Sequence, residues 1–377
     1  MKFGFAVLLA AVIGLAEPVG AEGLPATTAE QAAADLRQAI EALKAADSGK
    51  DRIAALTATI RAYETGLAAL RQALRGAAVR EAEISAGFEA RRDQLGQLLG
   101  VMSTMEQSPA PLLMLHPSGP LGTARSEMIL SSVAPAVQTE ADKLKAELTE
   151  MRNIRALHEE TAAMLQKGMD AVQGARTALA QAIQDRTDLP RRYLEDPEEL
   201  RTLIDNADTL DAFATGLARM ETDISPPRGN FASAAGSLPL PVLGRLLRRA
   251  GTADAAGITR PGMLVATHPA ALVVAPWAAT IRYRGPLLDY GNVMILEPAT
   301  GYLLVLAGMG TVYGETGDVL AAGDPVGLMG GDELKGVAAG AAQEGSGAGR
   351  TETLYIELRQ GGETIDPGPW FAETKEN

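Results

Sequence analysis

A seven-residue repeat of apolar residues is the feature that most constrains the fold of this chain. Apolar side chains recur at alternating spacings of four and three residues, at Leu56, Ile60, Tyr63, Leu67, Leu70 and Leu74. The same phase continues at Ala77, Glu81, Ile84, Phe88, Arg91, Leu95, Leu98, Met102 and Met105. Heptads sustained over this length, with charged flanks, are typical of a coiled coil. An earlier run is out of phase with this one, at Leu36, Ile40 and Leu43. We therefore expect a break near Asp47–Lys50.

A second heptad run follows a segment of helix-breaking residues. The segment Ser108–Thr123 includes Pro109, Pro111, Pro117, Gly119 and Pro120, which predict a bend. Beyond it, apolar residues recur at Leu130, Val133, Val137, Ala141, Leu144, Leu148, Met151, Ala162, Leu165, Met169, Val172, Leu179 and Ile183. Two runs of similar length joined by a bend predict a long antiparallel coiled-coil hairpin over residues 22–188.

Three polar residues need an interpretation within the hairpin. Arg155 and His158 lie in phase with the second run. Polar residues at such positions either set the register of the coil or mark a metal or switch site. His116 lies in the predicted bend, with no carboxylate or second histidine close in sequence, and we interpret it as structural.

A shorter helix is expected after the hairpin. The sequence Asp196-Pro197-Glu198-Glu199 has the proline and acidic residues typical of a helix start. An apolar face follows at Leu200, Leu203, Ile204, Leu210, Phe213, Leu217 and Met220. Pro226–Gly229 ends this helix, and the small residues of Asn230–Ser237 indicate a linker. Residues 189–237 are therefore predicted to be a connecting helix and a linker.

The C-terminal part of the chain has the period of strands. Short apolar runs lie between Gly and Pro turns, at Leu264–Ala266, Leu272–Ala275, Ala279–Arg284, Asn292–Glu297, Tyr302–Ala307 and Thr353–Arg359. Runs at this spacing predict an all-β domain of sandwich or barrel type. Gly317-Asp318 and Ala322–Pro325 indicate turns around one more hairpin. Gly330–Arg350 is rich in Gly and Ala and predicts a loop before the last strand.

The N-terminus has the pattern of a signal peptide. Lys2 supplies a positive charge, Phe5–Leu15 is apolar, and Val19-Gly20-Ala21 fits a cleavage site. The apolar run is short for a membrane span, so a permanent anchor is the weaker alternative. We expect residues 1–21 to be removed and the protein to be exported. The sequence contains no cysteine, so stability has to come from packing rather than from disulfides.

The charge balance bears on possible partners. The chain has 34 Lys and Arg residues against 47 Asp and Glu residues, for a net charge of −13. Binding to nucleic acid depends on clustered cations that neutralise phosphates. The composition therefore argues against a nucleic-acid partner.

The C-terminal part resembles the LytM-type domain, which is the β-fold of zinc peptidoglycan endopeptidases. Motifs of that family occur in family order over about 130 residues, and the order is more specific than any single motif. The matching segments are LPLPVLG (238–244), PGML (261–264), VAP (274–276), DYGN (289–292), GDV (317–319), AGDPVG (322–327) and TLYIELRQGGETIDPGPWF (353–371). The resemblance implies a degenerate LytM-type domain over residues 238–377, with a duplicated-hybrid-motif-like β-sandwich.

The resemblance also allows the zinc-binding positions of the family to be compared. Active LytM-type enzymes take their ligands from an H-x-x-x-D motif and from the second His of an H-x-H motif. In this chain Gly308 and Tyr355 stand where two histidines belong, and no H-x-x-x-D occurs in the sequence. Zinc hydrolysis requires three protein ligands and an open position for water. The resemblance therefore implies a domain without metal, cofactor or catalytic residues.

Other catalytic arrangements find little support in the sequence. His268 is the one histidine after residue 237, and it is either a remnant zinc ligand or a turn residue. A single imidazole without partners is a poor zinc site. The sequence contains no G-x-S-x-G elbow and no Walker loop.

A degenerate site retains a groove in which a partner can bind. Tyr and Arg side chains are frequent anchors of protein interfaces, and a small residue such as Gly308 opens the groove. Strand alternation places Tyr355, Glu357 and Arg359 on one face, opposite Leu354, Ile356 and Leu358. The candidate binding residues are Tyr290, Tyr355, Arg359, Gly308, Leu264 and Arg260. In the alternative interpretation Tyr355 fills the vacated metal pocket and Arg359 pairs with Glu357.

The whole chain is similar to the EnvC-like murein hydrolase activators. That resemblance implies a non-catalytic activator of periplasmic N-acetylmuramyl-L-alanine amidases at the division site of a Gram-negative cell. It implies that Leu200–Met220 covers the groove and that the coiled coil binds FtsX of the FtsEX complex. Direct binding to peptidoglycan is a further expectation. Two alternatives remain: a zinc endopeptidase with atypical ligands, and a coiled-coil scaffold that binds peptidoglycan.

Overall fold

The computed structural model describes residues 24–93, 96, 100, 120–186, 197–220, 230–253, 257–331 and 352–372. The predicted signal peptide, the part of the predicted bend before Pro120, and most of the predicted loop Gly330–Arg350 lie outside these residues. The chain divides into two compact units, one made of Ala68–Lys167 and the other of Met1–Leu67 and Gly168–Asn377. Among the described helices, none has the length and apolarity needed to cross a membrane.

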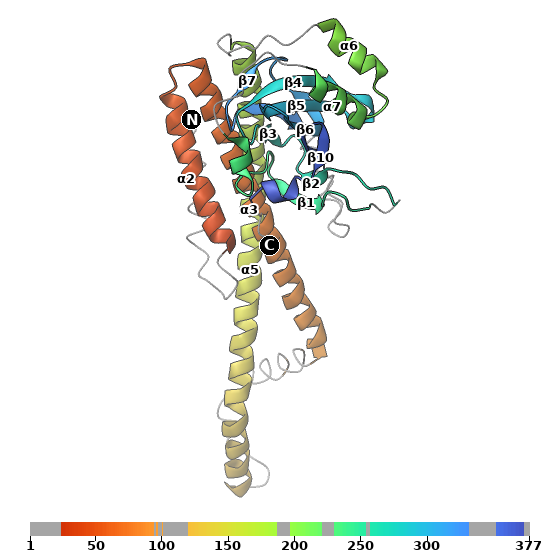
Figure 1. The fold of residues 1–377 in the computed structure, drawn as a ribbon. Coiled ribbons are helices and arrows are strands. Elements are labelled where there is room, and N and C mark those ends of the chain that lie inside the picture. The colour runs from red at the N-terminus through yellow and green to blue at the C-terminus, as the bar shows by residue number, and fades with distance from the viewer. Residues whose placement is uncertain are drawn as a thin grey trace. The chain divides into compact units, whose positions relative to one another are not determined.

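The N-terminal half is helical, as the heptads predict. Helices α2 (Leu24–Lys44) and α3 (Gly49–Ala90) are separated at the expected break, and α5 (Pro120–Gln184) follows (Figure 1). The Ser48 hydroxyl accepts a hydrogen bond from the Asp51 amide N–H at 3.1 Å, which caps the start of α3. Helix α5 begins at Pro120, inside the predicted bend, because proline is well tolerated in the first turn of a helix.

Within the unit Ala68–Lys167, α3 and α5 run antiparallel. Arg80 pairs with Glu150 at 2.7 Å, and Arg91 pairs with Glu147 at 2.8 Å, so residue numbers rise along α3 as they fall along α5. The half-buried or buried positions of α3 in this unit include the predicted seam residues Leu74, Ala77, Glu81, Ile84 and Phe88, and Arg91, which directly follows the helix, is half-buried too. This part of the seam in α3 is confirmed.

The seam of α5 differs from the prediction over about two turns, between Leu148 and Arg155. Leu148, predicted to face α3, is 41% exposed. The Arg155 side chain is 67% exposed and reaches Glu81 at 3.1 Å, whereas His158 is 30% exposed, with Nδ1 3.9 Å from Glu81. Ile154 is buried instead of Arg155, because the seam passes through a neighbouring position of the helix surface here.

In the other unit, a buried ion pair joins α3 to α5. Arg176 of α5 donates to Glu64 of α3 at 2.9 Å, and their side chains are 3% and 8% exposed. The same Glu64 oxygen accepts a hydrogen bond from the backbone N–H of Leu272 at 3.0 Å. Burial of a carboxylate is tolerated here because a cation and a backbone donor both compensate its charge.

The C-terminal half folds as an antiparallel β-domain, as predicted. Its strands are β1 (Gly244–Arg248), β2 (Met263–Thr267), β3 (Leu272–Val274), β4 (Ala279–Pro286), β5 (Asn292–Ala299), β6 (Tyr302–Val312), β7 (Val319–Leu320), β8 (Pro325–Met329), β9 (Glu352–Gln360) and β10 (Glu363–Ile365). The main path of the sheet is β1-β2-β9-β6-β5-β4-β7. Strand β8 pairs with β3 and β6, and not with β7 as the predicted extra hairpin would require.

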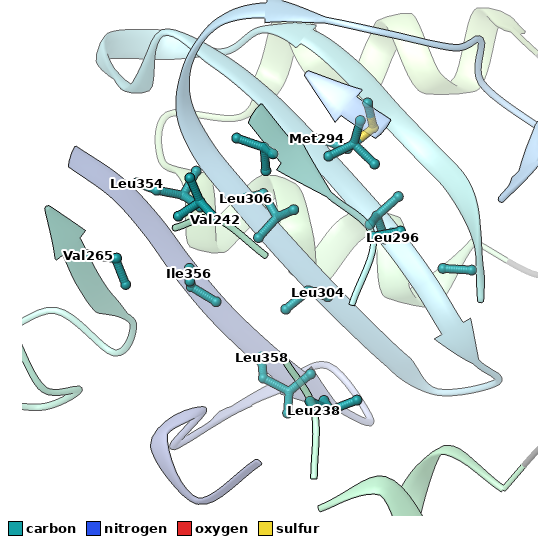
Figure 2. Packing of buried hydrophobic residues seen from close by; sticks show 14 of the residues in the cluster. Leu238, Val242, Val265, Met294, Leu296, Leu304, Leu306, Leu354, Ile356 and Leu358 are labelled. Carbon is teal, nitrogen blue, oxygen red and sulfur yellow. The ribbon is translucent and has the colours of Figure 1, made fainter. Parts of the chain in front are cut away.

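One face of the sheet forms the main core. Side chains of β5, β6 and β9 point to the same side in Figure 2, among them Leu306, Leu354 and Ile356, which are each 0% exposed. The predicted linker Asn230–Ser237 contributes to this core, because it contains a short 3-10 helix at Phe231–Ala234. The Phe231 ring is 1% exposed and stacks on Trp370 at 4.9 Å.

Two short helices replace the single helix expected at Leu200–Met220. They are α6 (Pro197–Asn206) and α7 (Leu210–Arg219). The Thr209 side chain accepts a hydrogen bond from the Ala212 N–H at 3.1 Å and so starts a new helix. Gly216 allows α6 to pack closely on α7, since a Cβ at that position would lie 2.3 Å from a methyl carbon of Leu203.

Candidate functional site

The second face of the sheet carries the candidate site. Tyr355, Glu357 and Arg359 of β9 point to this face, because strand alternation sends Leu354, Ile356 and Leu358 into the main core. Tyr355 lies opposite Ala307 of β6 and Leu264 of β2 in the register. We call this surface the groove face. It consists of the side chains of β2, β4, β5, β6 and β9 that lie on this side of the sheet: Leu264, Tyr283, Val293, Ile295, Leu303, Val305, Ala307, Tyr355, Glu357 and Arg359.

Helix α7 covers much of the groove face. Figure 1 shows it beside β4, β5 and β6. Its apolar side packs on the sheet through Leu210, Phe213, Ala214 and Leu217, all at most 3% exposed. The Phe213 ring meets the Tyr283 ring edge-on, with centroids 4.8 Å apart, a geometry that aromatic pairs favour. The sheet residues in this cluster are therefore buried by a helix that lies before the β-domain in sequence.

Arg359 connects the N-terminal part of α7 to the sheet. Its guanidinium donates to Asp211 at 2.9 Å and to Thr215 at 2.7 Å, both on α7. It also donates to Glu357 at 2.7 Å and to the Gly362 carbonyl at 2.7 Å. With Arg359 and Glu357 each 2% exposed, this ion pair is shielded from water.

A second arginine meets the other end of α7. Arg282 of β4 donates to the carbonyls of Leu217 and Met220, at 3.3 and 3.4 Å. It also pairs with Glu297 at 2.8 Å and is 4% exposed. The last carbonyls of a helix have no partner within the helix and carry partial negative charge, so a cation is stabilising there.

Tyr355 is buried within a hydrogen-bond chain. Its hydroxyl donates to Glu357 at 2.5 Å and accepts from the Gly262 N–H at 3.1 Å. Burial, and then the neighbouring Glu357 carboxylate, raise the pKa of Tyr355 well above its ordinary value. Tyr355 therefore remains a neutral phenol at physiological pH, and its role here is that of a hydrogen-bond donor.

The other predicted binding residues lie at different depths. The Tyr290 ring is half-buried, with its centroid 6.0 Å from that of Tyr355, and Leu264 is half-buried at the margin of the same cluster. Arg260 is half-buried in the β1–β2 connection, where its carbonyl accepts from the Gly251 N–H at 2.8 Å. Tyr355 and Arg359 lie on one face of β9, as strand alternation predicted, but both are buried rather than exposed, and Arg359 is hydrogen-bonded to α7.

Gly308 lies at an irregular point of β6. The register between β5 and β6 shifts between the pairs Asn292↔Met309 and Val293↔Ala307, and Gly308 has φ +96°. A Cβ at this position would lie 2.6 Å from the Thr353 carbonyl oxygen. Gly308 was predicted to open the groove. The structure instead shows that its missing side chain permits a close approach of two strands.

Gly308→Ala should therefore destabilise the β-domain by about 2–4 kcal/mol, through an unfavourable φ and a backbone clash. Gly301→Ala is the matched control, since Gly301 has φ +80° but no atom within 4 Å of the place that a Cβ would take. The control should cost only about 1 kcal/mol. Both tryptophans are partly buried and pack against the main core of the β-domain, so urea unfolding followed by tryptophan fluorescence measures this difference. Equal losses would contradict the close-approach explanation.

Among the described residues, no cluster of three or more His, Cys, Asp or Glu side chains could hold a metal ion. His268 is exposed and lies in the turn before β3, where its carbonyl accepts from the Ala271 N–H at 3.2 Å. This position agrees with the interpretation of His268 as a turn residue.

One segment of the chain matches a known protein family. Residues 259–367 match the family model described as Peptidase family M23. This segment is an M23 domain of the LytM type. A search of curated proteins found no match to the chain.

Several solved structures are similar to parts of the chain. One is a putative peptidase M23 from Pseudomonas aeruginosa, with 16% identity over 47% of this chain and 64% of that chain and a TM-score of 0.32. Another is Csd3 from Helicobacter pylori, with 17% identity over 37% of this chain and 36% of that chain and a TM-score of 0.28. A third is a mutant form of the catalytic domain of the prophage-encoded M23 protein EnpA from Enterococcus faecalis, with 18% identity over 38% of this chain and 94% of that chain and a TM-score of 0.26. The chain spans less than two thirds of the length of the first two proteins.

Proposed function

We propose that this chain is a non-catalytic activator of periplasmic N-acetylmuramyl-L-alanine amidases in septal peptidoglycan cleavage. In this proposal the amidase binds the groove face of the M23 domain, and α7 blocks that face until a regulator displaces it. The observation that carries the proposal is the cover itself. Arg359 is 2% exposed and donates to Asp211 and Thr215 of α7, and Tyr355 is 5% exposed within the cluster that α7 shares with the sheet. Both stand on the strand where the resemblance expects a zinc-binding histidine.

The chemistry of the groove face supports a binding role over a catalytic one. Tyr355 donates to one carboxylate oxygen of Glu357 and Arg359 donates to the other, although the buried Nε of Arg359 has no hydrogen-bond partner among the residues that the structure describes. A substrate or water would have to replace these hydrogen bonds before any reaction. Aromatic and arginine side chains on an otherwise apolar surface are, in contrast, typical anchors for a protein partner.

The energetics of α7 suit a reversible cover. Each large apolar side chain that α7 buries contributes at most about 1.5–3 kcal/mol. An isolated helix of this length is unstable in water, so α7 depends on its contacts with the sheet. A partner that binds only the uncovered face shifts the equilibrium by its differential affinity for the two states. We assign the release of α7 to FtsX of the FtsEX complex, bound through the coiled coil.

A pair of fragments tests this function. Residues 230–377 include Phe231 and so the whole main core, whereas residues 197–377 also carry α6 and α7. Mixed with a periplasmic amidase and dye-labelled sacculi, the shorter fragment should stimulate dye release and the longer one should stimulate it at least about tenfold less. The failure of a folded shorter fragment to stimulate any candidate amidase would overturn the proposal.

The zinc endopeptidase alternative makes a different prediction. If the groove face only binds a partner, the purified protein should contain far less than one zinc per chain, and stimulation of the amidase should not need zinc on this chain. Metal analysis after incubation with zinc and exhaustive dialysis measures the content directly. Stoichiometric zinc, together with peptide-bond cleavage in sacculi without an amidase, would favour the enzyme.

A further inference from the structure

Strand β1 forms the end of the main sheet path. In the part of the chain that the structure describes, β1 pairs with β2 alone, so its other edge has no strand beside it. The unpaired backbone groups of an edge strand can accept another strand, and proteins usually protect such edges. Beyond β1 the ladder continues irregularly, through the Gly251 N–H bonded to the Arg260 carbonyl and a bridge between Ala253 and Thr259.

This edge is basic, although the protein as a whole is acidic. Between residues 238 and 267 the sequence contains Arg245, Arg248, Arg249 and Arg260 and a single acidic residue, Asp254, whereas the net charge of the chain is −13. Arg245 and Arg249 are exposed. Neither takes part in an ion pair within the described residues. The local excess of positive charge is therefore available to an anionic partner.

A bulge combines charge with apolar surface along the same strand. Leu246 pairs with Val265 and Arg248 with Leu264, which leaves Leu247 without an opposite residue on β2. Leu247 is 48% exposed, and Leu243 just before β1 is 42% exposed. Exposed leucines between arginines are suited to a partner that carries both acidic and apolar side chains.

The β1 edge lies outside the cover provided by α7. The cluster beneath α7 is built from β4, β5, β6 and β9, and it reaches β2 only through the half-buried Leu264. Arg245 pairs with Ala266, which lies further along β2 and outside this cluster. A partner at β1 would therefore not have to displace α7.

We propose that the β1 edge binds an extended, acidic peptide segment of another protein, which adds to the sheet as an eleventh strand. Main-chain hydrogen bonds to the free edge provide the affinity in this mode, and side chains select the partner. Glutamates or aspartates beside Arg245 and Arg249 supply charge complementarity, and apolar residues contact Leu247. This inference does not depend on the amidase role, because it concerns a different edge of the domain.

The test uses the full chain and a fluorescein-labelled peptide in which glutamate alternates with valine and threonine. Fluorescence anisotropy should show saturable binding that weakens with salt. The variant R245E/R249E should bind at least about tenfold more weakly, because two attractive charge contacts with the peptide become repulsive. The control R52E/R152E makes the same change in charge at two exposed arginines of the coiled coil and should bind like the unaltered protein.

A second probe separates strand addition from simple charge attraction. The same peptide, N-methylated at alternate residues, keeps its charges but cannot donate along one edge, and at least one of its two N-methylated registers should lose binding about tenfold or more. If both methylated peptides bound as tightly as the unmethylated peptide, strand addition would be overturned. If the folded native protein showed no saturable binding of the peptide, the proposed site would be overturned. The arginines would then serve only to protect the edge of the sheet. If R245E/R249E reduced binding to purified sacculi but not to the peptide, the partner would be peptidoglycan and the proposal would be wrong.

Discussion

Replacing Ala214 with glutamate should release α7 from the groove face and make the protein stimulate amidases without a regulator. Ala214 is 0% exposed, between the helix and the sheet. A carboxylate placed there without a partner costs several kcal/mol, and about 3 kcal/mol already changes a docking equilibrium by more than a hundredfold. Dye release from labelled sacculi measures the stimulation, and hydrogen exchange of the backbone amides in α7 measures its release.

Ala212→Glu provides the matched control for this variant. Ala212 lies on the same helix but is exposed, and an acidic residue in the first turn of a helix is tolerated or slightly stabilising. It should leave both measurements unchanged. If A214E speeds hydrogen exchange in α7 without stimulating any amidase, then α7 covers the face but the proposed function is wrong. If A214E leaves the exchange unchanged, the cover itself is not reversible in the way we propose.

Replacing Arg359 with alanine should destabilise the β-domain by about 3–5 kcal/mol, because Glu357 would keep a buried charge without its cation. The substitution also removes the contacts to Asp211 and Thr215, so α7 should be released at the same time. Urea unfolding followed by tryptophan fluorescence measures the stability of the domain. Hydrogen exchange under native conditions measures the release of α7.

Two further variants make the interpretation of R359A specific. Arg284 forms an ion pair with Glu315, and the two side chains are 33% and 57% exposed. Arg284→Ala should therefore lower the stability of the domain by less than about 1 kcal/mol. The neutral pair E357Q/R359M should recover part of the stability lost in R359A, since no charge is then left buried. A loss in R359A no larger than that in R284A would show that the buried ion pair contributes little.

The helical half and most of the large strands could be predicted from the sequence because their patterns are local. The seam of α3 follows from heptad spacing, and β2, β4, β5, β6 and β9 follow from alternation between turns. Strand β1 was missed because its sequence, GRLLR, has few β-favouring residues and a bulge that breaks the alternation. Strand β7 is too short to carry a period.

The helix break before α7 shows the limit of reading an apolar face alone. Apolar spacing joined Leu200 to Met220 as one helix, whereas Thr209 begins a second helix by capping it. Thr209 is a good N-cap residue, and that signal was present in the sequence. The close packing of Leu203 on Gly216 could not be read from spacing, because it depends on how the two helices fold back on each other.

The sequence by itself determined which residues occupy β9, the strand that carries the candidate site. It placed Tyr355, Glu357 and Arg359 on one face of β9, and the structure confirms that placement. Only the tertiary structure decided what this face contacts. A ten-residue helix, distant in sequence, forms hydrogen bonds with Arg359 and packs in one cluster with Tyr355, so two side chains that were expected to be exposed are buried. The physical reason is that strand alternation is fixed by neighbouring residues, whereas the occupant of a face is selected by long-range burial and charge compensation.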